Sequence, residues 1–353
     1  MKSNVYFIRV DSQDNSQRIK SLQKFLDKLG HVLTYQKEEF VPVKITIGDT
    51  SCVYNIKPEF VRCIITHIKN QQARPFLFDT NVIYLGQRQN AIQHLNLAQN
   101  KGFAHSRVGA PFIIADGIFG QDGREFKINS ANVNKIKVPS FVGMLDSLLV
   151  LSHATGHILS GYAGAIKNVA MGMSCRPTKQ TIHSLLKPHI LTDRCTTCRC
   201  CIAICPKGAI SYKDSKVSID PTKCIGCAEC LCACKFNAIS INWQEEPLVF
   251  IRRLVEVANF ILSKFKNKFF INFAFDITKE CDCISTKDEK MIVDDLGIFA
   301  SDDIVAVDKA TVDMAKNYKR MPLLDQTEKI YTEMFLYAQR IGMGSAEYSL
   351  IQL

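Results

Sequence analysis

The sequence contains no apolar run of the ~20 residues that a helix needs to span a bilayer. Its start also lacks the features of a signal peptide, because a short apolar run is followed at once by the polar stretch DSQDNSQ. These two absences predict a protein that does not enter a membrane. We expect it to work in the cytoplasm.

A dense basic segment is also missing, although the formal net charge is +10. The densest basic run, at 264–268, follows a helical pattern, and lysine near a helix C-terminus complements the helix dipole. We therefore expect no nucleic acid among the binding partners. No nicotinamide or flavin fingerprint is present either, since GQDG and GYAG are too short to match G-x-G-x-x-G.

The cysteines are not spread in the way that a disulfide framework requires. Of the 15 cysteines, ten lie between Cys195 and Cys234, whereas bridges that staple a small fold are distributed over its loops. Such clustering is typical of metal ligation. It predicts a reducing compartment, in an oxygen-poor cell.

Outside this cysteine-rich segment, short apolar runs alternate with segments of helical periodicity. The alternation predicts an α/β fold with a layered, mostly parallel sheet. Strands are expected at 4–10, 41–48, 74–80, 110–117, 148–153, 269–275 and 296–301, helices at 19–29, 57–70, 91–102, 249–265, 303–318 and 328–342, and a β-hairpin or meander at 123–139. The cysteines interrupt the alternation, so we expect one α/β domain from 1–188 and 244–353, with a small α+β ferredoxin-like insert at 189–243.

The insert contains the spacing C-x2-C-x2-C-x3-C twice. Three thiolates from a tight loop and one from a distant turn suit the corners of a 4Fe-4S cubane, and the double run resembles the bacterial two-cluster ferredoxins. That resemblance implies two 4Fe-4S clusters, with the fourth cysteine of each run binding the other cluster. The implied ligand sets are Cys195, Cys198 and Cys201 with Cys234, and Cys224, Cys227 and Cys230 with Cys205.

Structural zinc is the alternative for this segment, since paired C-x2-C spacings also bind zinc. A zinc site would not require two cysteine runs with the spacing x2-x2-x3. The repeated spacing therefore favours iron–sulfur clusters. Pro206 follows the first run, but Lys235 follows the second, where we expect a different turn with ligation kept. Cys200 and Cys232 occupy non-ligand positions, and we expect them to pack beside the clusters.

Several segments outside the insert resemble DUF362, a family without an assigned reaction that often accompanies ferredoxin modules. They are RPFLFDTN, APFIIADG, LSHATGHILSGYAGAIKNVAMGM, CDC at 281–283 and LGIFASDDIVAVDKA, and the resemblance covers nearly the whole chain. The chain departs from that family at VKITIGD. There the family has a histidine at the position of Thr46 and a glutamate near Asp49.

Two further groups of residues are candidates for a site. Cys281 and Cys283 follow a strand, and a C-x-C pair can hold a soft metal or a cluster edge with help from Cys175 or a histidine. Simple burial in the core is the alternative for the pair. Asp79 and Asp116 end strands, where open α/β sheets place their ligands, so we expect both to bind a cofactor.

The segment 153–183 carries His157, Lys167 and His183, with Gly161 and Gly164 just before the lysine. This order resembles the nickel-pincer lactate racemases, in which matching residues tether and coordinate a pyridinium-derived cofactor. The resemblance implies Lys167 as the anchor of a ligand, His183 as a metal or cofactor ligand and His157 as an acid/base group. The glycines would let the ligand approach the backbone closely. A glycine-rich contact between helices is the alternative.

These observations predict an iron–sulfur redox protein, with no assigned substrate. Its two clusters would take electrons from a partner protein and pass them to a small-molecule substrate or cofactor in the α/β domain. An additional metal or a nucleotide-like cofactor is a candidate there. The alternative is a non-enzymatic electron carrier, or a cluster-handling accessory protein, whose α/β domain docks a partner enzyme. A deep pocket with convergent polar groups would favour the enzyme.

Overall fold

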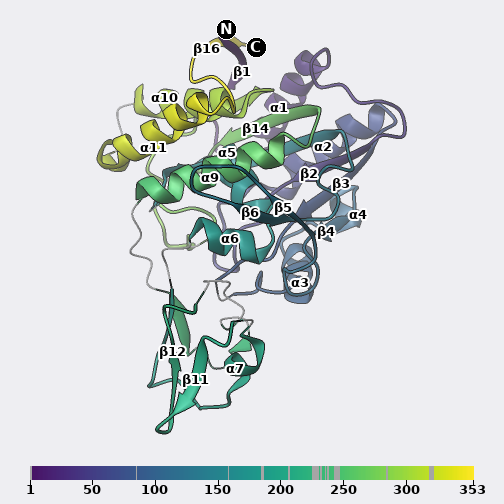
Figure 1. The fold of residues 1–353 in the computed structure, drawn as a ribbon. Coiled ribbons are helices and arrows are strands. Elements are labelled where there is room, and N and C mark those ends of the chain that lie inside the picture. The colour runs from purple at the N-terminus through teal and green to yellow at the C-terminus, as the bar shows by residue number, and fades with distance from the viewer. Residues whose placement is uncertain are drawn as a thin grey trace.

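The computed structural model describes residues 2–84, 86–157, 159–183, 187–205, 207–224, 230, 233–234, 236, 238–241, 247–283, 285–317 and 322–353. At its centre is an eight-stranded sheet in the order β16-β1-β15-β14-β7-β2-β3-β4 (Figure 1). The strands are β1 (Ser3–Arg9), β2 (Phe40–Lys44), β3 (Arg74–Asp79), β4 (Phe112–Ile114), β7 (Ser147–His153), β14 (Asn267–Ala274), β15 (Gly297–Ser301) and β16 (Tyr348–Gln352). Only β15 runs antiparallel to its neighbours, so the predicted mostly parallel α/β sheet is confirmed.

Helices cover both faces of this sheet. The first face carries α1 (Asn15–Leu29), α2 (Pro58–Asn70), α3 (Ala91–Asn100) and the short α4 (His105–Val108); the second carries α5 (Ala165–Gly172), α6 (Arg176–Ile182), α9 (Pro247–Leu262), α10 (Ile304–Asn317) and α11 (Pro322–Arg340). Strand β7 shows the consequence for the sequence. Its Leu148 and Val150 join the core under the second group, while Leu149 and Leu151 join the core under the first. A strand buried on both faces therefore reads as a continuous apolar run.

Helix α1 illustrates how local signals set the element boundaries. The side chain of Asp14 accepts a hydrogen bond from the backbone N–H of Ser16 and so caps the first turn. The buried Leu22, Phe25, Leu26 and Leu29 recur at helical spacing on the face that meets the sheet. The predicted helix is confirmed, and Gly30 follows it as predicted.

Within the central sheet, the two edge strands depart most from the prediction, and the inner strand β2 ends at Lys44 rather than at residue 48. Residues 110–117 were expected to form a buried strand, but β4 has only three residues and leaves Ile113 44% exposed. The final strand β16 was not expected, and its residues are half-buried or exposed. An edge strand has a neighbouring strand on one side only and is less buried, so its apolar pattern is weaker than that of a central strand.

In the described part of the chain, four two-stranded sheets lie outside the central sheet. The hairpin of β5 (Arg124–Lys127) and β6 (Lys135–Val138) confirms the one predicted at 123–139, and β8 (Thr155–His157) pairs with β9 (Gly161–Ala163). The other two belong to the cysteine-rich segment: β10 (Pro188–Ile190) pairs with β13 (Ile239–Ile241), and β11 (Ile210–Lys213) pairs with β12 (Lys216–Ile219), next to α7 (Cys200–Ile204).

This cysteine-rich part projects away from the sheet and its helices (Figure 1). None of its described strands joins the eight-stranded sheet. The insert boundaries at 189 and 243 stay a prediction.

Candidate functional site

A cavity of about 640 Å³ opens where the parallel strands β2, β3 and β7 end. The last residues of these strands, Lys44, Asp79 and His153, all line it. Helices α5 and α6, the β8–β9 hairpin, the segments that follow β2 and β3, and the loop at 281–283 supply the rest of the described wall. The carboxyl ends of strands are where open α/β sheets hold their ligands, as the sequence predicts for Asp79.

Most of the predicted site residues meet in this cavity. Its lining includes His157, Gly164, Lys167, His183, Cys281 and Cys283. The rings of His157 and His183 both pack against Phe250, with centroids 6.0 Å and 4.7 Å from it. The three side chains of the racemase-like segment thus converge on one space. Their roles as ligand anchor, metal ligand and acid/base group stay predictions.

Two predicted cofactor-binding residues lie outside the described lining. The buried carboxylate of Asp116 accepts hydrogen bonds from the backbone and side-chain N–H groups of Asn81, both at 2.9 Å, and burial raises its pKa to about 7. Gly161 adopts a φ of 72°, which glycine tolerates best, at the turn between β8 and β9. Both residues therefore serve local structure, and the binding of a cofactor by either one stays a prediction.

Two glycines near Lys167, Gly164 and Gly172, have other side chains of the protein packed closely against them. A Cβ on Gly164 would lie 2.4 Å from the Asp308 carboxylate, and one on Gly172 would lie 2.3 Å from Cε of Lys44. Asp308 accepts hydrogen bonds from the first N–H groups of α5, those of Ala165 and Ile166. This contact fixes the helix that carries Lys167. Both glycines thus admit buried side chains of the protein, and they also line the cavity, so their predicted contact with a ligand stays a prediction.

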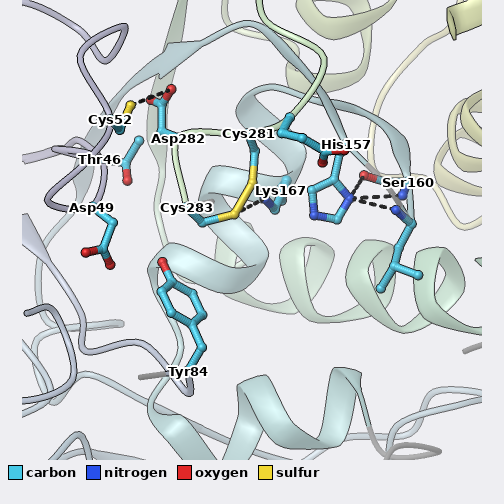
Figure 2. Close-up of a disulfide and its surroundings, with 12 residues drawn as sticks. Thr46, Asp49, Cys52, Tyr84, His157, Ser160, Lys167, Cys281, Asp282 and Cys283 are labelled. Atoms are coloured by element: carbon cyan, nitrogen blue, oxygen red, sulfur yellow. Dashed lines mark hydrogen bonds between the residues drawn. A yellow bond between two sulfur atoms is a disulfide. The ribbon is translucent and has the colours of Figure 1, made fainter. Parts of the chain in front are cut away.

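A pair of sulfur atoms forms part of the cavity wall (Figure 2). Cys281 and Cys283 are joined by a disulfide, and Nζ of Lys167 lies 3.0 Å from Sγ of Cys281 and 3.6 Å from Sγ of Cys283. Burial lowers the pKa of Lys167 to about 7. Only the reduced pair could ligate the metal that the sequence predicts, so this metal stays a prediction.

The ring of His157 is held in one tautomer by backbone groups. Its Nδ1 accepts hydrogen bonds from the N–H groups of Leu159 at 3.2 Å and Ser160 at 3.0 Å. Backbone N–H groups can only donate, so Nδ1 is unprotonated and a neutral ring carries its proton on Nε2. Burial and the nearby charges of Lys167 and His183 hold the pKa of His157 well below its usual range. His157 therefore presents a neutral N–H donor to the cavity, and its predicted role as an acid/base group stays a prediction.

His153 is held in the opposite state. Its Nδ1 lies 2.7 Å from the Asp282 carboxylate, and its Nε2 lies 2.7 Å from the carbonyl oxygen of Phe275. Both partners are acceptors, so both nitrogens carry protons. Burial alone would lower the pKa of His153, but the charge and hydrogen bond of Asp282 raise it. The cationic His153 fixes Asp282, which stands between the two cysteines.

The charge of His153 predicts a pH-dependent stability. Replacing His153 by Gln should lower the free energy of unfolding most below the unfolded-state pKa of ~6.5. The loss should shrink as pH rises through the raised folded-state pKa, because the charged pair then disappears from the native protein. Denaturant unfolding of both proteins between pH 5 and 9 measures this, with the exposed His31→Gln as the control. A loss that grows with pH would contradict the assignment.

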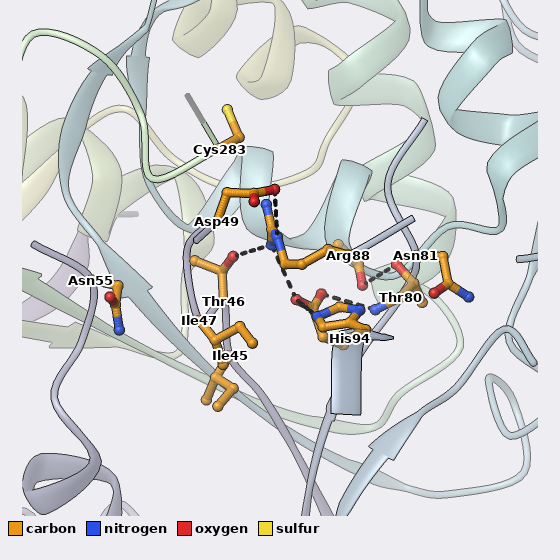
Figure 3. A network of polar contacts seen from close by, with 12 residues as sticks. Ile45, Thr46, Ile47, Asp49, Asn55, Thr80, Asn81, Arg88, His94 and Cys283 are labelled. Atoms are coloured by element: carbon orange, nitrogen blue, oxygen red, sulfur yellow. Dashed lines mark hydrogen bonds and ion pairs between the residues drawn. The ribbon is translucent and has the colours of Figure 1, made fainter. Parts of the chain in front are cut away.

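A second charged network lies beside the cavity (Figure 3). Nζ of the fully buried Lys44 lies 3.0 Å from Oδ1 of Asp79, and Nη1 of Arg88 lies 3.5 Å from Oδ2. Arg88 also donates to Oγ1 of Thr46 at 3.1 Å and lies 3.8 Å from Asp49. Thr46 and Asp49, two positions singled out from the sequence, thus lie close to Arg88 and help to orient it.

Three further cations line the cavity wall and were not predicted from the sequence: Lys44, Arg88 and Lys179. Nζ of Lys179 donates to Oγ1 of Thr80 at 2.8 Å and to the carbonyl oxygen of Asn81, and burial lowers its pKa to about 8. One signal was available, since Lys44 is a charged residue inside the apolar run VPVKITIG. A lysine buried in a strand needs a negatively charged or hydrogen-bonding partner, and a buried charged pair of this kind is a candidate for a functional site.

The cysteine-rich segment contains a small hollow of about 20 Å³. Among its lining residues are Cys195, Cys198, Cys201 and Cys234, which is the first implied ligand set. It combines three cysteines of one run with the fourth of the other. These four thiols are free and gathered around one space, so they fit a group that needs four thiolate corners.

The second implied set is only partly described. Cys205 is a free thiol and Cys224 and Cys230 lie within the described part of the chain, whereas Cys227, Cys232 and Lys235 lie outside it. The two runs match in one detail: the Sγ atoms of Cys205 and Cys234 each accept a backbone N–H at 3.3 Å. Cys200 is exposed, which corrects the expectation that it packs inside the module.

Comparison with known proteins decides the family. The family model described as a domain of unknown function, DUF362, matches residues 41–313. The chain belongs to the DUF362 family. This confirms the resemblance drawn from the sequence, and the matched range includes both the cavity and the cysteine-rich segment.

Short stretches of this DUF362 protein are also similar to curated proteins. It is 44% identical over 46 residues to the iron-sulfur subunit of a putative dimethyl sulfoxide reductase of Halobacterium salinarum, covering 13% of this chain and 18% of that protein. It is 34% identical over 73 residues to the thiosulfate reductase electron transfer subunit PhsB of Salmonella typhi, covering 20% of this chain and 38% of that protein. The chain thus spans less than half the length of either relative.

Among solved structures, the lactate racemase apoprotein of Thermoanaerobacterium thermosaccharolyticum aligns with 79% of this chain and 51% of its own, at 11% identity and a TM-score of 0.40. Within the described part of the chain, no helix combines the length and apolar character needed to cross a membrane.

Proposed function

We propose that this DUF362 protein is an iron–sulfur redox protein that carries two 4Fe-4S clusters in its cysteine-rich segment. The observation that carries the proposal is the crossed set of four free thiols, Cys195, Cys198, Cys201 and Cys234, around one hollow. Clusters held in this way supply one-electron transfer at low potential. The short similarities to an iron-sulfur subunit and an electron transfer subunit support it.

The proposal assigns the α/β cavity to the molecule that exchanges electrons with the clusters. Lys167 and Lys179 line the cavity and form no ion pair with a carboxylate of the described residues. Burial lowers the pKa of each lysine, although the charge of Asp282 acts on Lys167 and that of Asp116 acts on Lys179. Buried cations whose charge is only partly balanced favour an anionic ligand. His157 adds an N–H donor. We therefore infer a substrate or cofactor with a carboxylate or phosphate group, and a redox partner protein that docks near the clusters.

The cavity separates this function from the alternative of an electron carrier. A carrier needs an exposed docking surface, whereas this protein encloses about 640 Å³ lined by convergent polar groups. The polypeptide continues from His183, at the end of α6 in the cavity wall, to β10 of the cysteine-rich segment. This short connection favours delivery of electrons into the cavity over delivery to a distant surface.

Anaerobic purification tests the proposal. The protein should contain about eight irons per chain and should show charge-transfer absorption that bleaches on reduction. Denaturing it should release an anionic small molecule, detectable by mass spectrometry, that is lost from a Lys179→Met variant. A zinc-loaded protein without visible absorption would overturn the cluster assignment. Full iron occupancy without any bound small molecule in either protein would favour the carrier.

A further inference from the structure

The sulfur pair at the cavity wall has surroundings that the proposed function does not yet use. Cys281 is 4% exposed, and Cys283 is half-buried and faces the cavity. The two cysteines are two residues apart in a loop, so the bond between them can open and close without a large movement of the chain. Outside the cysteine-rich segment, two other described cysteines, Cys52 and Cys175, are also buried but are free thiols.

The contacts of Lys167 point at these sulfur atoms. Its described hydrogen bonds go to Sγ of Cys281 and Sγ of Cys283, at 3.0 Å and 3.6 Å. A disulfide sulfur is a weak acceptor, whereas a thiolate is a full negative charge. Opening the bond would therefore give the buried ammonium group a charged partner at hydrogen-bond distance. A lysine placed in this way stabilises the reduced form of the pair.

His157 distinguishes a redox pair from a metal site. Its ring nitrogen and the two sulfur atoms lie within 4.8 Å of one another, a spacing that would also suit a metal ion. Its Nδ1, however, is occupied by the two backbone donors at 159 and 160, so the neutral ring carries its proton on Nε2. A nitrogen that carries a proton cannot ligate a metal, but it can donate to a thiolate.

We propose that Cys281 and Cys283 form a redox-active dithiol–disulfide pair in the cavity wall, with Lys167 and His157 as donors that stabilise its reduced form. The pair takes up two electrons and two protons, which break the S–S bond and give two S–H groups, one of which can lose its proton to become a thiolate paired with Lys167. The electrons come from a low-potential iron–sulfur donor, so the inference rests on the proposed function for its reductant. The pair then stores two electrons beside the substrate.

Thiol trapping in redox buffers tests this inference on the whole protein. The protein is equilibrated anaerobically with mixtures of reduced and oxidised dithiothreitol and alkylated, and the 281–283 peptide is quantified by mass spectrometry. We expect the peptide to convert between disulfide and doubly alkylated forms as a single two-electron transition. Lys167→Met should shift the equilibrium about tenfold towards the disulfide, or ~30 mV, while Lys167→Arg keeps the wild-type value. The exposed Lys135→Met is the matched control.

Three outcomes would overturn the inference. They are a pair that stays reduced in every buffer and carries a stoichiometric metal, a pair that stays oxidised in every buffer, and a Lys167→Met variant with the wild-type equilibrium. Cys175, a buried free thiol, serves as an internal standard for accessibility in the same digests. Chemical reductants drive this assay, so it succeeds or fails independently of the iron content that tests the clusters.

Discussion

Replacing Cys195 and Cys234 together by serine is expected to remove one cluster and leave the other. Iron content should fall from about eight to about four per chain. Replacing Cys195 and Cys205 together should remove ligands from both clusters and take the iron content towards zero. Each double variant deletes two cysteines. Their iron contents should therefore differ only because the two cysteines bind the same cluster in one variant and different clusters in the other.

The reason lies in the geometry of the cysteine-rich segment. Cys234 belongs to the second run in the sequence but lines the same hollow as Cys195, Cys198 and Cys201. Cys205 belongs to the first run but is absent from the described lining of that hollow. A 4Fe-4S cluster needs four thiolates, so the loss of two from one set should cost one cluster.

Anaerobic iron and sulfide analysis, with electron paramagnetic resonance of the reduced proteins, measures the outcome. The exposed Cys200→Ser variant is the control, and it should keep all the iron. The opposite pattern, in which the Cys195 and Cys205 pair leaves one cluster intact, would show that each run binds its own cluster. Equal and complete loss in both double variants would show that the two clusters do not assemble independently, and the crossed sets would then lack support.

The central strands and the long helices could be predicted because each buries a strongly periodic or continuous apolar surface. The run in β7 and the spacing of Leu22, Phe25 and Leu29 in α1 are examples. The edges could not be predicted, because the strand at 348–352 is stabilised by backbone pairing with β1 and not by its own apolar pattern. Pairing between the two ends of a chain leaves little trace in a local window of sequence.

The residues of the candidate site also fall into those that could be predicted from the sequence and those that could not. Histidine and cysteine are chemically distinctive, so His157, His183 and the 281–283 pair could be singled out from the sequence. Lys179 could not, because its importance comes from a contact with Thr80, 99 residues away in the chain. The side chains that pack against the glycines could not be predicted for a related reason. What lies opposite a glycine, such as Lys44 opposite Gly172, is decided by the tertiary structure.

Replacing Asp79 by alanine is expected to lower the free energy of unfolding by about 3–5 kcal/mol. Asp79 is 3% exposed and accepts from Lys44, Arg88 and the backbone N–H of Thr80. Burial alone would raise the pKa of Asp79, but the positive charge of Lys44 holds it well below its usual range. The carboxylate is therefore charged in the native protein. Its loss leaves buried cations with too little negative charge nearby.

The matched control is a salt bridge at the surface. Arg107 lies 2.7 Å from Glu59, and their side chains are 60% and 32% exposed. Water already solvates such a pair, so Glu59→Ala should cost only about 0–1 kcal/mol. Urea unfolding of the three proteins, at equal iron content and neutral pH, measures both differences. Asp79→Asn separates charge from shape, because it keeps the size of the side chain. It should still show most of the loss in the free energy of unfolding seen for Asp79→Ala, because Lys44 and Arg88 need a negative partner and not merely an acceptor. A cost for Asp79→Ala no larger than that for Glu59→Ala would mean that Lys44 and Arg88 reach solvent, and that the cavity floor is more open than its burial indicates.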